Sequence, residues 1–149
     1  MKLLLVLLFA VRILSAQSSL EKFLSVEWSI DKTTLYEVYD KSVLKEEKIL
    51  SYSGVTYQDS LKGEFAKYLF LFNSEHKLIG KAIGNISESE TEVEYLFPIL
   101  KTIAINKFGN PTSESEMMGM LMLSWEEHNA LNILLNRMKT KCMLMILKK

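Results

Sequence analysis

Hydrophobic and polar positions along this chain follow two patterns, one typical of helices and one typical of strands. Apolar residues recur three and four positions apart in residues 30–41 and again in residues 93–108, which is the period of an amphipathic helix. Shorter apolar or alternating runs follow each of these segments, and turn residues separate them, as in antiparallel strands. The pattern therefore predicts the order helix, three strands, helix, three strands.

The first helix is predicted over residues 30–41. Ser29 is a candidate N-cap, and Asp31 places a negative charge in the first turn, where it favours the helix dipole. The face predicted to be buried carries Leu35, Val38 and Tyr39.

The second helix has the stronger pattern. Thr91 and Glu94 match a capping box, and Gly109 is a typical C-terminal stop. Pro98 removes a backbone hydrogen bond, so the helix is either kinked there or begins near Tyr95. The predicted buried stripe is Val93, Leu96, Phe97, Leu100, Ile103, Ala104 and Phe108.

Six strands are predicted, three after each helix. Residues 73–76, Asn-Ser-Glu-His, are a polar link of the kind that closes a hairpin between the second and third strands. Residues 68–72, Tyr-Leu-Phe-Leu-Phe, are apolar on both faces, which predicts a central strand with one face under a helix and the other under a cover that the pattern does not identify. The predicted strands are 48–57, 65–72, 77–85, 118–127, 130–138 and 141–149.

These elements predict an α+β fold in which an antiparallel sheet of about six strands carries two helices on one face. The chain of 149 residues suits a single domain, expected over residues 19–149. The order αβββαβββ also suggests two halves related as an internal pseudo-repeat, although their sequences do not align.

The first 18 residues are typical of a signal peptide. Lys2 precedes an apolar run, Leu3–Val11, that is too short to span a bilayer as a helix. Cleavage is expected after Ser18, with cleavage after Ala16 or retention as an anchor as alternatives. No cysteine follows the apolar run, so a soluble periplasmic or secreted product is expected rather than a lipoprotein.

The charge of the chain bears on its partners, and its cysteine content bears on disulfide bonds. The chain has 18 basic and 18 acidic residues, and no basic face is concentrated enough to follow a phosphate backbone. Nucleic acid is therefore not an expected partner. Cys142 is the one cysteine, so no internal disulfide forms, and its place in an apolar run predicts a buried side chain.

Two short motifs carry a resemblance to a known class. Residues 28–38, WSIDKTTLYEV, and residues 105–111, INKFGNP, are followed by a strand with Trp125 and Glu126. With the order of elements, they resemble small exported bacterial modules that include the beta-lactamase-inhibitor-like and SmpA/OmlA-like domains. The resemblance implies a binding or assembly role rather than catalysis and transfers no site residues. The absence of a lipid-attachment cysteine departs from the lipoprotein members.

Methionines are concentrated near the C-terminus, where seven of the eight lie between Met117 and Met145. Met118, Met120 and Met122 alternate, so a strand would direct all three to one face. Such side chains fill irregular interfaces. Alternatively, their thioethers suit Cu(I), which makes a periplasmic copper carrier the second hypothesis. No His or Cys is spaced beside them to complete a metal site.

Motifs of catalysis and cofactor binding are missing from the sequence. It contains no nucleophile elbow, P-loop, zinc-protease helix or dinucleotide fingerprint. His76 is expected in a solvated turn, and His128 with Glu126 offers only two ligands. We therefore expect a protein that is not an enzyme and binds no cofactor.

The function predicted from the sequence is binding through the sheet face that has no helix on it. Aromatic and methionine side chains dominate the energetics of many interfaces. We expect another protein as the partner, with a homodimer as an alternative and no small-molecule substrate identified. The candidate contacts are Tyr57, Met118, Met120, Met122 and Trp125.

Overall fold

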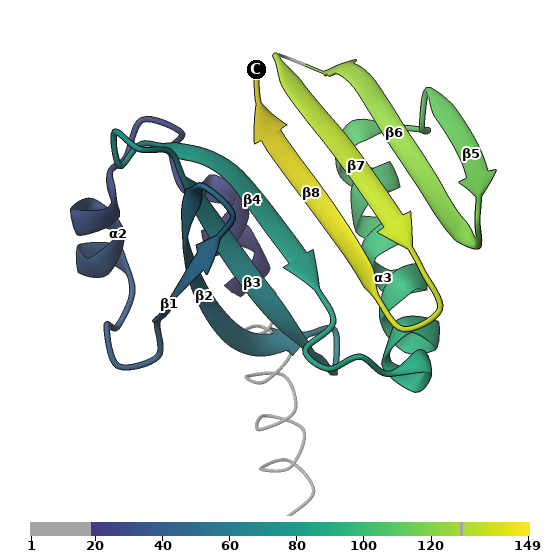
Figure 1. Cartoon of the computed structure of the whole chain (residues 1–149), viewed down its shortest axis with the longest axis horizontal. Helices are drawn as coiled ribbons and strands as arrows, with labels where there is room; N and C mark the ends of the chain where they lie inside the picture. Colours follow the sequence, from purple (N-terminus) through teal and green to yellow (C-terminus); the bar gives the residue numbers. More distant parts are fainter. Residues whose placement is uncertain (1–18, 129) are drawn as a thin grey trace, which may run out of the picture.

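Residues 19–128 and 130–149 are described by a computed structural model, and the predicted signal peptide, residues 1–18, lies outside them. Within these ranges the protein is an α+β fold with one antiparallel sheet of eight strands and three helical segments (Figure 1). The predicted class is therefore confirmed, and the predicted numbers of strands and helices are too low.

The sheet consists of two four-stranded meanders that meet in its centre. The strand order is β1-β2-β3-β4-β8-β7-β6-β5, so β4 pairs with β8 and the edges are β1 and β5. The first meander has β1 (Lys45–Ile49), β2 (Tyr52–Leu61), β3 (Glu64–Phe72) and β4 (Leu78–Gly84). The second has β5 (Ser113–Met117), β6 (Met120–His128), β7 (Leu131–Arg137) and β8 (Cys142–Lys148).

All three helical segments pack on the same face of this sheet. α3 (Glu90–Phe108) lies against β7 and β8. The segment of residues 19–25 places the Phe23 ring against Tyr68 and Phe70 of β3. α2 (Lys32–Val38) buries Leu35 in the same core. The prediction of helices on one face is confirmed, and the opposite face carries no helix among the described residues (Figure 1).

α3 follows its predicted stripe but begins earlier than predicted. Its N-cap is Ser89, whose side chain accepts a hydrogen bond from the Glu92 amide, so the capping pair lies two residues before Thr91 and Glu94. The helix begins at Glu90, so the alternative start near Tyr95 is wrong, and Pro98 lies inside the helix. Of the predicted stripe, Val93, Leu96, Phe97, Leu100, Ile103 and Ala104 are buried, and Phe108 is half-buried.

α2 is shorter than predicted. Asp31, not Ser29, is the N-cap, because its carboxylate accepts a hydrogen bond from the Thr34 amide at 2.9 Å. The helix ends at Val38, whose side chain is exposed rather than buried.

Two tight turns account for the strands that the pattern missed. Leu50, with a positive φ of 55°, starts the turn that divides the predicted strand 48–57 into β1 and β2. Met118 and Gly119, with φ of 54° and 77°, form the turn between β5 and β6, as in a two-residue hairpin of type I′. The observed halves therefore have four strands each instead of three.

Candidate functional site

The face of the sheet that carries no described helix is apolar across its centre. Residues alternate between the two faces of a strand, so the apolar residues that lie between the buried core residues of β3, β7 and β8 point to this helix-free face. Their side chains are half-buried, which leaves part of each in contact with solvent. We call these six residues the apolar stripe: Leu69, Leu71, Leu134, Met143, Met145 and Leu147.

Small residues of β4 make a depression in the middle of this face. Gly80, Ala82 and Gly84 are the β4 residues directed there, and their neighbours on β3 and β8 carry large apolar side chains. A Cβ at Gly80 would lie 2.9 Å from Leu147 Cδ2, so glycine allows the leucine to lean over β4. A Cβ at Gly84 would lie 2.7 Å from a backbone oxygen of β8, which requires glycine at that close approach.

A groove of about 370 Å³ opens at the Gly84 end of the depression. Polar and charged side chains stand around it, among them Glu47, Lys67 and Asn136. Its apolar lining comes from four strands, the loop after β4 and the turn before β8: Ile49, Leu69, Ala82, Gly84, Ile86, Met138, Cys142 and Met143.

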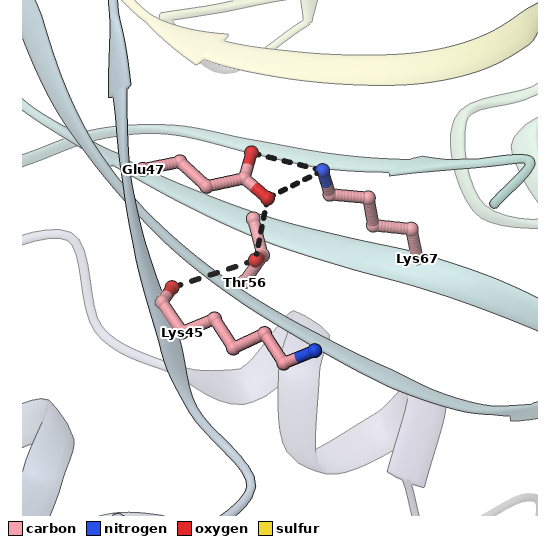
Figure 2. Close-up of polar contacts among 4 residues, drawn as sticks. All are labelled: Lys45, Glu47, Thr56 and Lys67. Atoms are coloured by element: carbon pink, nitrogen blue, oxygen red, sulfur yellow. Dashed lines mark hydrogen bonds and ion pairs between the residues drawn. The ribbon is translucent and has the colours of Figure 1, made fainter. Parts of the chain in front are cut away.

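An ion pair between two strands forms one wall of the groove (Figure 2). Lys67 Nζ on β3 donates hydrogen bonds to both carboxylate oxygens of Glu47 on β1, at 2.7 and 2.8 Å. Thr56 lies between them on β2, and its hydroxyl donates to Glu47 Oε1 at 3.2 Å. The bonds from Lys67 hold the pKa of Glu47 below its ordinary value although partial burial opposes this shift. The carboxylate is therefore ionised at neutral pH.

The rim of the groove is held by Asn85 at the end of β4. Its side-chain amide donates to the Thr140 carbonyl at 2.8 Å and accepts from the Cys142 amide at 2.9 Å. A second ion pair, Lys141 with Glu88 at 2.5 Å, crosses the same rim. These bonds connect the loop after β4 to the turn before β8, so the groove has a defined end.

Only some of the contacts predicted from the sequence lie on the helix-free face. Met120 and Met122 point there from β6. Met118 lies in the β5–β6 turn with 99% of its surface exposed, so it does not share a strand face with them. The cause is the turn, which the alternating pattern did not reveal.

Tyr57 and Trp125 lie on the other face, and their predicted place on the helix-free face is wrong. Tyr57 is 6% exposed and stacks on Tyr68, with ring centroids 4.8 Å apart. Trp125 is 2% exposed, and its indole N–H donates to the Gly109 carbonyl at 2.7 Å. Both are core residues that the folded domain shields from a partner.

The apolar stripe was missed as a site, although the sequence carried two signals of it. Residues 68–72 are apolar on both faces, and Gly80, Ala82 and Gly84 are small residues at the period of a strand. Together they indicate a close approach of side chains over β4, but not which face it occupies.

Of the titratable residues singled out from the sequence, His76 lies in a turn and Cys142 is buried beside the groove. His76 lies in the β3–β4 turn, as predicted, with a φ of 59°. The structure does not describe the position of the His128 side chain. Cys142 is buried, as predicted, and burial raises the pKa of its thiol to about 11, so the thiol stays protonated at neutral pH. In the described ranges no three His, Cys, Asp or Glu residues form a group that could hold a metal ion.

Comparisons with known proteins assign no family. No protein-family profile matches the chain, and no curated protein or solved structure matches it. None of the helices within the described residues is long and apolar enough to cross a membrane.

Proposed function

We propose that this is an exported, non-catalytic binding or envelope-assembly protein that contacts a protein partner with the helix-free face of its sheet. The observation that carries the proposal is the apolar stripe, whose residues on β3 flank the depression over β4 on one side and whose residues on β8 and β7 flank it on the other, next to the groove. Contiguous apolar patches of this kind on soluble proteins mark interaction sites.

The side chains of the apolar stripe suit a protein surface as their partner. Burial of leucine and methionine side chains against a partner lowers the free energy by roughly 25 cal/mol per Å² of apolar surface removed from water. Met143 and Met145 are unbranched and adapt their shape to an incoming segment. The Glu47–Lys67 pair supplies polar groups at the side of the groove, which can fix the orientation of a bound chain.

Contact through the face is favoured over the addition of a strand at an edge. The edge strands β1 and β5 are five residues each, with the sequences KEEKI and SESEM. Short edges that carry charge disfavour pairing with another chain. We therefore expect the partner to present apolar side chains to the apolar stripe rather than a free backbone edge.

Site-specific photocrosslinking in the native cells tests the proposal. Benzoylphenylalanine replaces Met145 on the helix-free face in one variant and Tyr95, exposed on the outer side of α3, in the control. We expect one discrete heterologous adduct from position 145 and none from position 95. The adduct should disappear when Leu134→Glu is added, because Leu134 is the β7 neighbour of Met145.

Circular dichroism and the melting temperature establish that each variant is folded before crosslinking. Equal adducts from both positions, an adduct that survives Leu134→Glu, or the absence of any adduct would contradict the proposal. An adduct of twice the chain mass would identify a second copy instead of a different protein.

A further inference from the structure

The β5–β6 hairpin brings together three methionines at the β5 edge of the sheet. Met117 and Met120 are direct partners across the two-residue turn, and the Cβ atoms of such a pair are about 5 Å apart. Met122 is two residues farther along β6, so its side chain leaves the strand on the same face. The strand register therefore places Met117 on the same face as Met120 and Met122.

These side chains are unusually open to solvent for methionines. Met117 is 66% exposed and Met122 is 36% exposed, and both belong to one strand pair. Filling of the core therefore does not account for them. Each has three rotatable bonds in its side chain, which is enough freedom for three sulfur atoms on neighbouring positions to converge on one ion.

The surroundings restrict which ion the three thioethers would take. The other β5 and β6 residues that share their face nearby are Ser113, Ser115 and Ser124. Ser113 and Ser124 already share a hydrogen bond at 2.6 Å. Thioethers are neutral, soft ligands that select Cu(I) and its analogue Ag(I), whereas Zn²⁺ and Ca²⁺ prefer imidazole, thiolate or carboxylate groups.

Methionines elsewhere on the helix-free face do not belong to this cluster. Met143 on β8 is separated from Met122 on β6 by Asn136 of β7, which places their backbones about 9.6 Å apart. We propose that Met117, Met120 and Met122 form a three-thioether site for Cu(I) at the β5–β6 hairpin. The site is independent of the partner proposed for the apolar stripe.

Methyl NMR of the whole mature protein during titration with Ag(I) tests the site directly. The methyl resonances of Met117, Met120 and Met122 should shift and saturate at one equivalent, while that of Met145 stays in place. Competition between the protein and bicinchoninate for Cu(I) under reducing conditions gives the affinity. The triple change Met117→Leu, Met120→Leu and Met122→Leu should weaken it by at least about tenfold, or about 1.4 kcal/mol.

Two variants serve as matched controls. Met118→Leu changes the exposed turn residue of the same hairpin, and Met143→Leu changes a methionine of the apolar stripe; both should leave the affinity unchanged. Unaltered affinity of the triple variant, shifts spread over all methionine methyls, or equal binding of Zn²⁺ would overturn the site. Loss of Ag(I) binding with crosslinking from position 145 retained would separate this site from the proposed function.

Discussion

On β8, Leu144 and Ile146 are buried against α3 and the core, whereas Met143 and Met145 on the same strand are only half-buried on the other face. Both faces are apolar, but they use different side chains. The covered face has branched and aromatic residues, which pack into one arrangement. The helix-free face has four leucines and two methionines and no aromatic residue in its apolar stripe, and the small residues of β4 beside them leave room for the methionines to adapt. The covered face is therefore packed against fixed neighbours, whereas the side chains of the helix-free face stay partly open to solvent.

The two faces also treat charge differently. The covered face buries Lys81 without a carboxylate partner among the described residues. Its ammonium group donates to the Leu24 carbonyl at 2.9 Å and to the Val26 carbonyl, and it lies over the Trp28 ring. It therefore fixes the end of the segment of residues 19–25, where helix carbonyls lack partners. The helix-free face instead carries the solvent-accessible pair Glu47 and Lys67.

Truncation of neighbouring residues on β8 should give the largest difference between the faces. Leu144→Ala leaves a cavity in the core, and we expect it to lower the free energy of unfolding by about 2–5 kcal/mol. Met145→Ala removes a half-exposed side chain and should cost about 1 kcal/mol. Urea denaturation of the two variants and the wild-type protein measures both values.

An equal cost for the two truncations would contradict the comparison, because it would mean that Met145 is covered in the free protein. The measurement is repeated at several protein concentrations. A stability that rises with concentration would identify a second copy as the cover.

Helix α3 and the class of fold could be predicted because their signals are long and redundant. The stripe from Val93 to Ala104 repeats the helical period over three turns, and six of its seven predicted residues are buried. The start was harder, since Ser89 with Glu92 and Thr91 with Glu94 both fit a capping box. Only the observed hydrogen bond distinguishes them.

Strands at the edges could not be predicted, for physical reasons. β5, SESEM, is exposed at every residue, so it has no alternation of apolar and polar positions. The turn at Leu50 and Ser51 contains no Gly, Pro, Asn or Asp, and a single Ser is a weak turn signal.

Prediction of the site residues required knowing which face of the sheet each strand residue occupies. The alternating pattern shows that neighbouring residues lie on opposite faces, but not which face is covered. Tyr57 and Trp125 were assigned to the helix-free face, but both belong to the core. A shift of one residue moves a side chain to the opposite face of a strand. Met120 and Met122 were assigned to that face correctly, because Leu121 and Leu123 pack on the covered side.

The buried ammonium of Lys81 should make stability rise with pH. Burial, aided by the nearby charge of Lys107, lowers the pKa of Lys81 from 10.5 to about 8. Between these values the unfolded chain binds more protons than the folded one, so raising the pH favours the folded state. We expect the free energy of unfolding to increase by about 1 kcal/mol between pH 7 and pH 9.

Lys81→Met is the control for this effect, because it removes the titrating group. The increase should be absent from the variant, and a ¹³C titration of the lysine side chain in the wild-type protein reports the same pKa without a substitution. The comparison stops at pH 9, since burial raises the pKa values of Tyr57 and Tyr68, and the folded state loses stability above the unfolded tyrosine pKa. A flat profile with an ordinary lysine titration would show that the ammonium is solvated.

The ion pair on the helix-free face should contribute the least. In a double-mutant cycle with Glu47→Gln and Lys67→Met, we expect a coupling energy below about 1 kcal/mol, as for other exposed pairs, and a smaller value at high salt. Because Lys67 lowers the pKa of Glu47, the coupling is present above the ordinary carboxylate pKa and is lost as pH falls through the lowered one. A coupling well above 2 kcal/mol that resists salt would mean that the groove is dry in the free protein, and the two faces would then be alike.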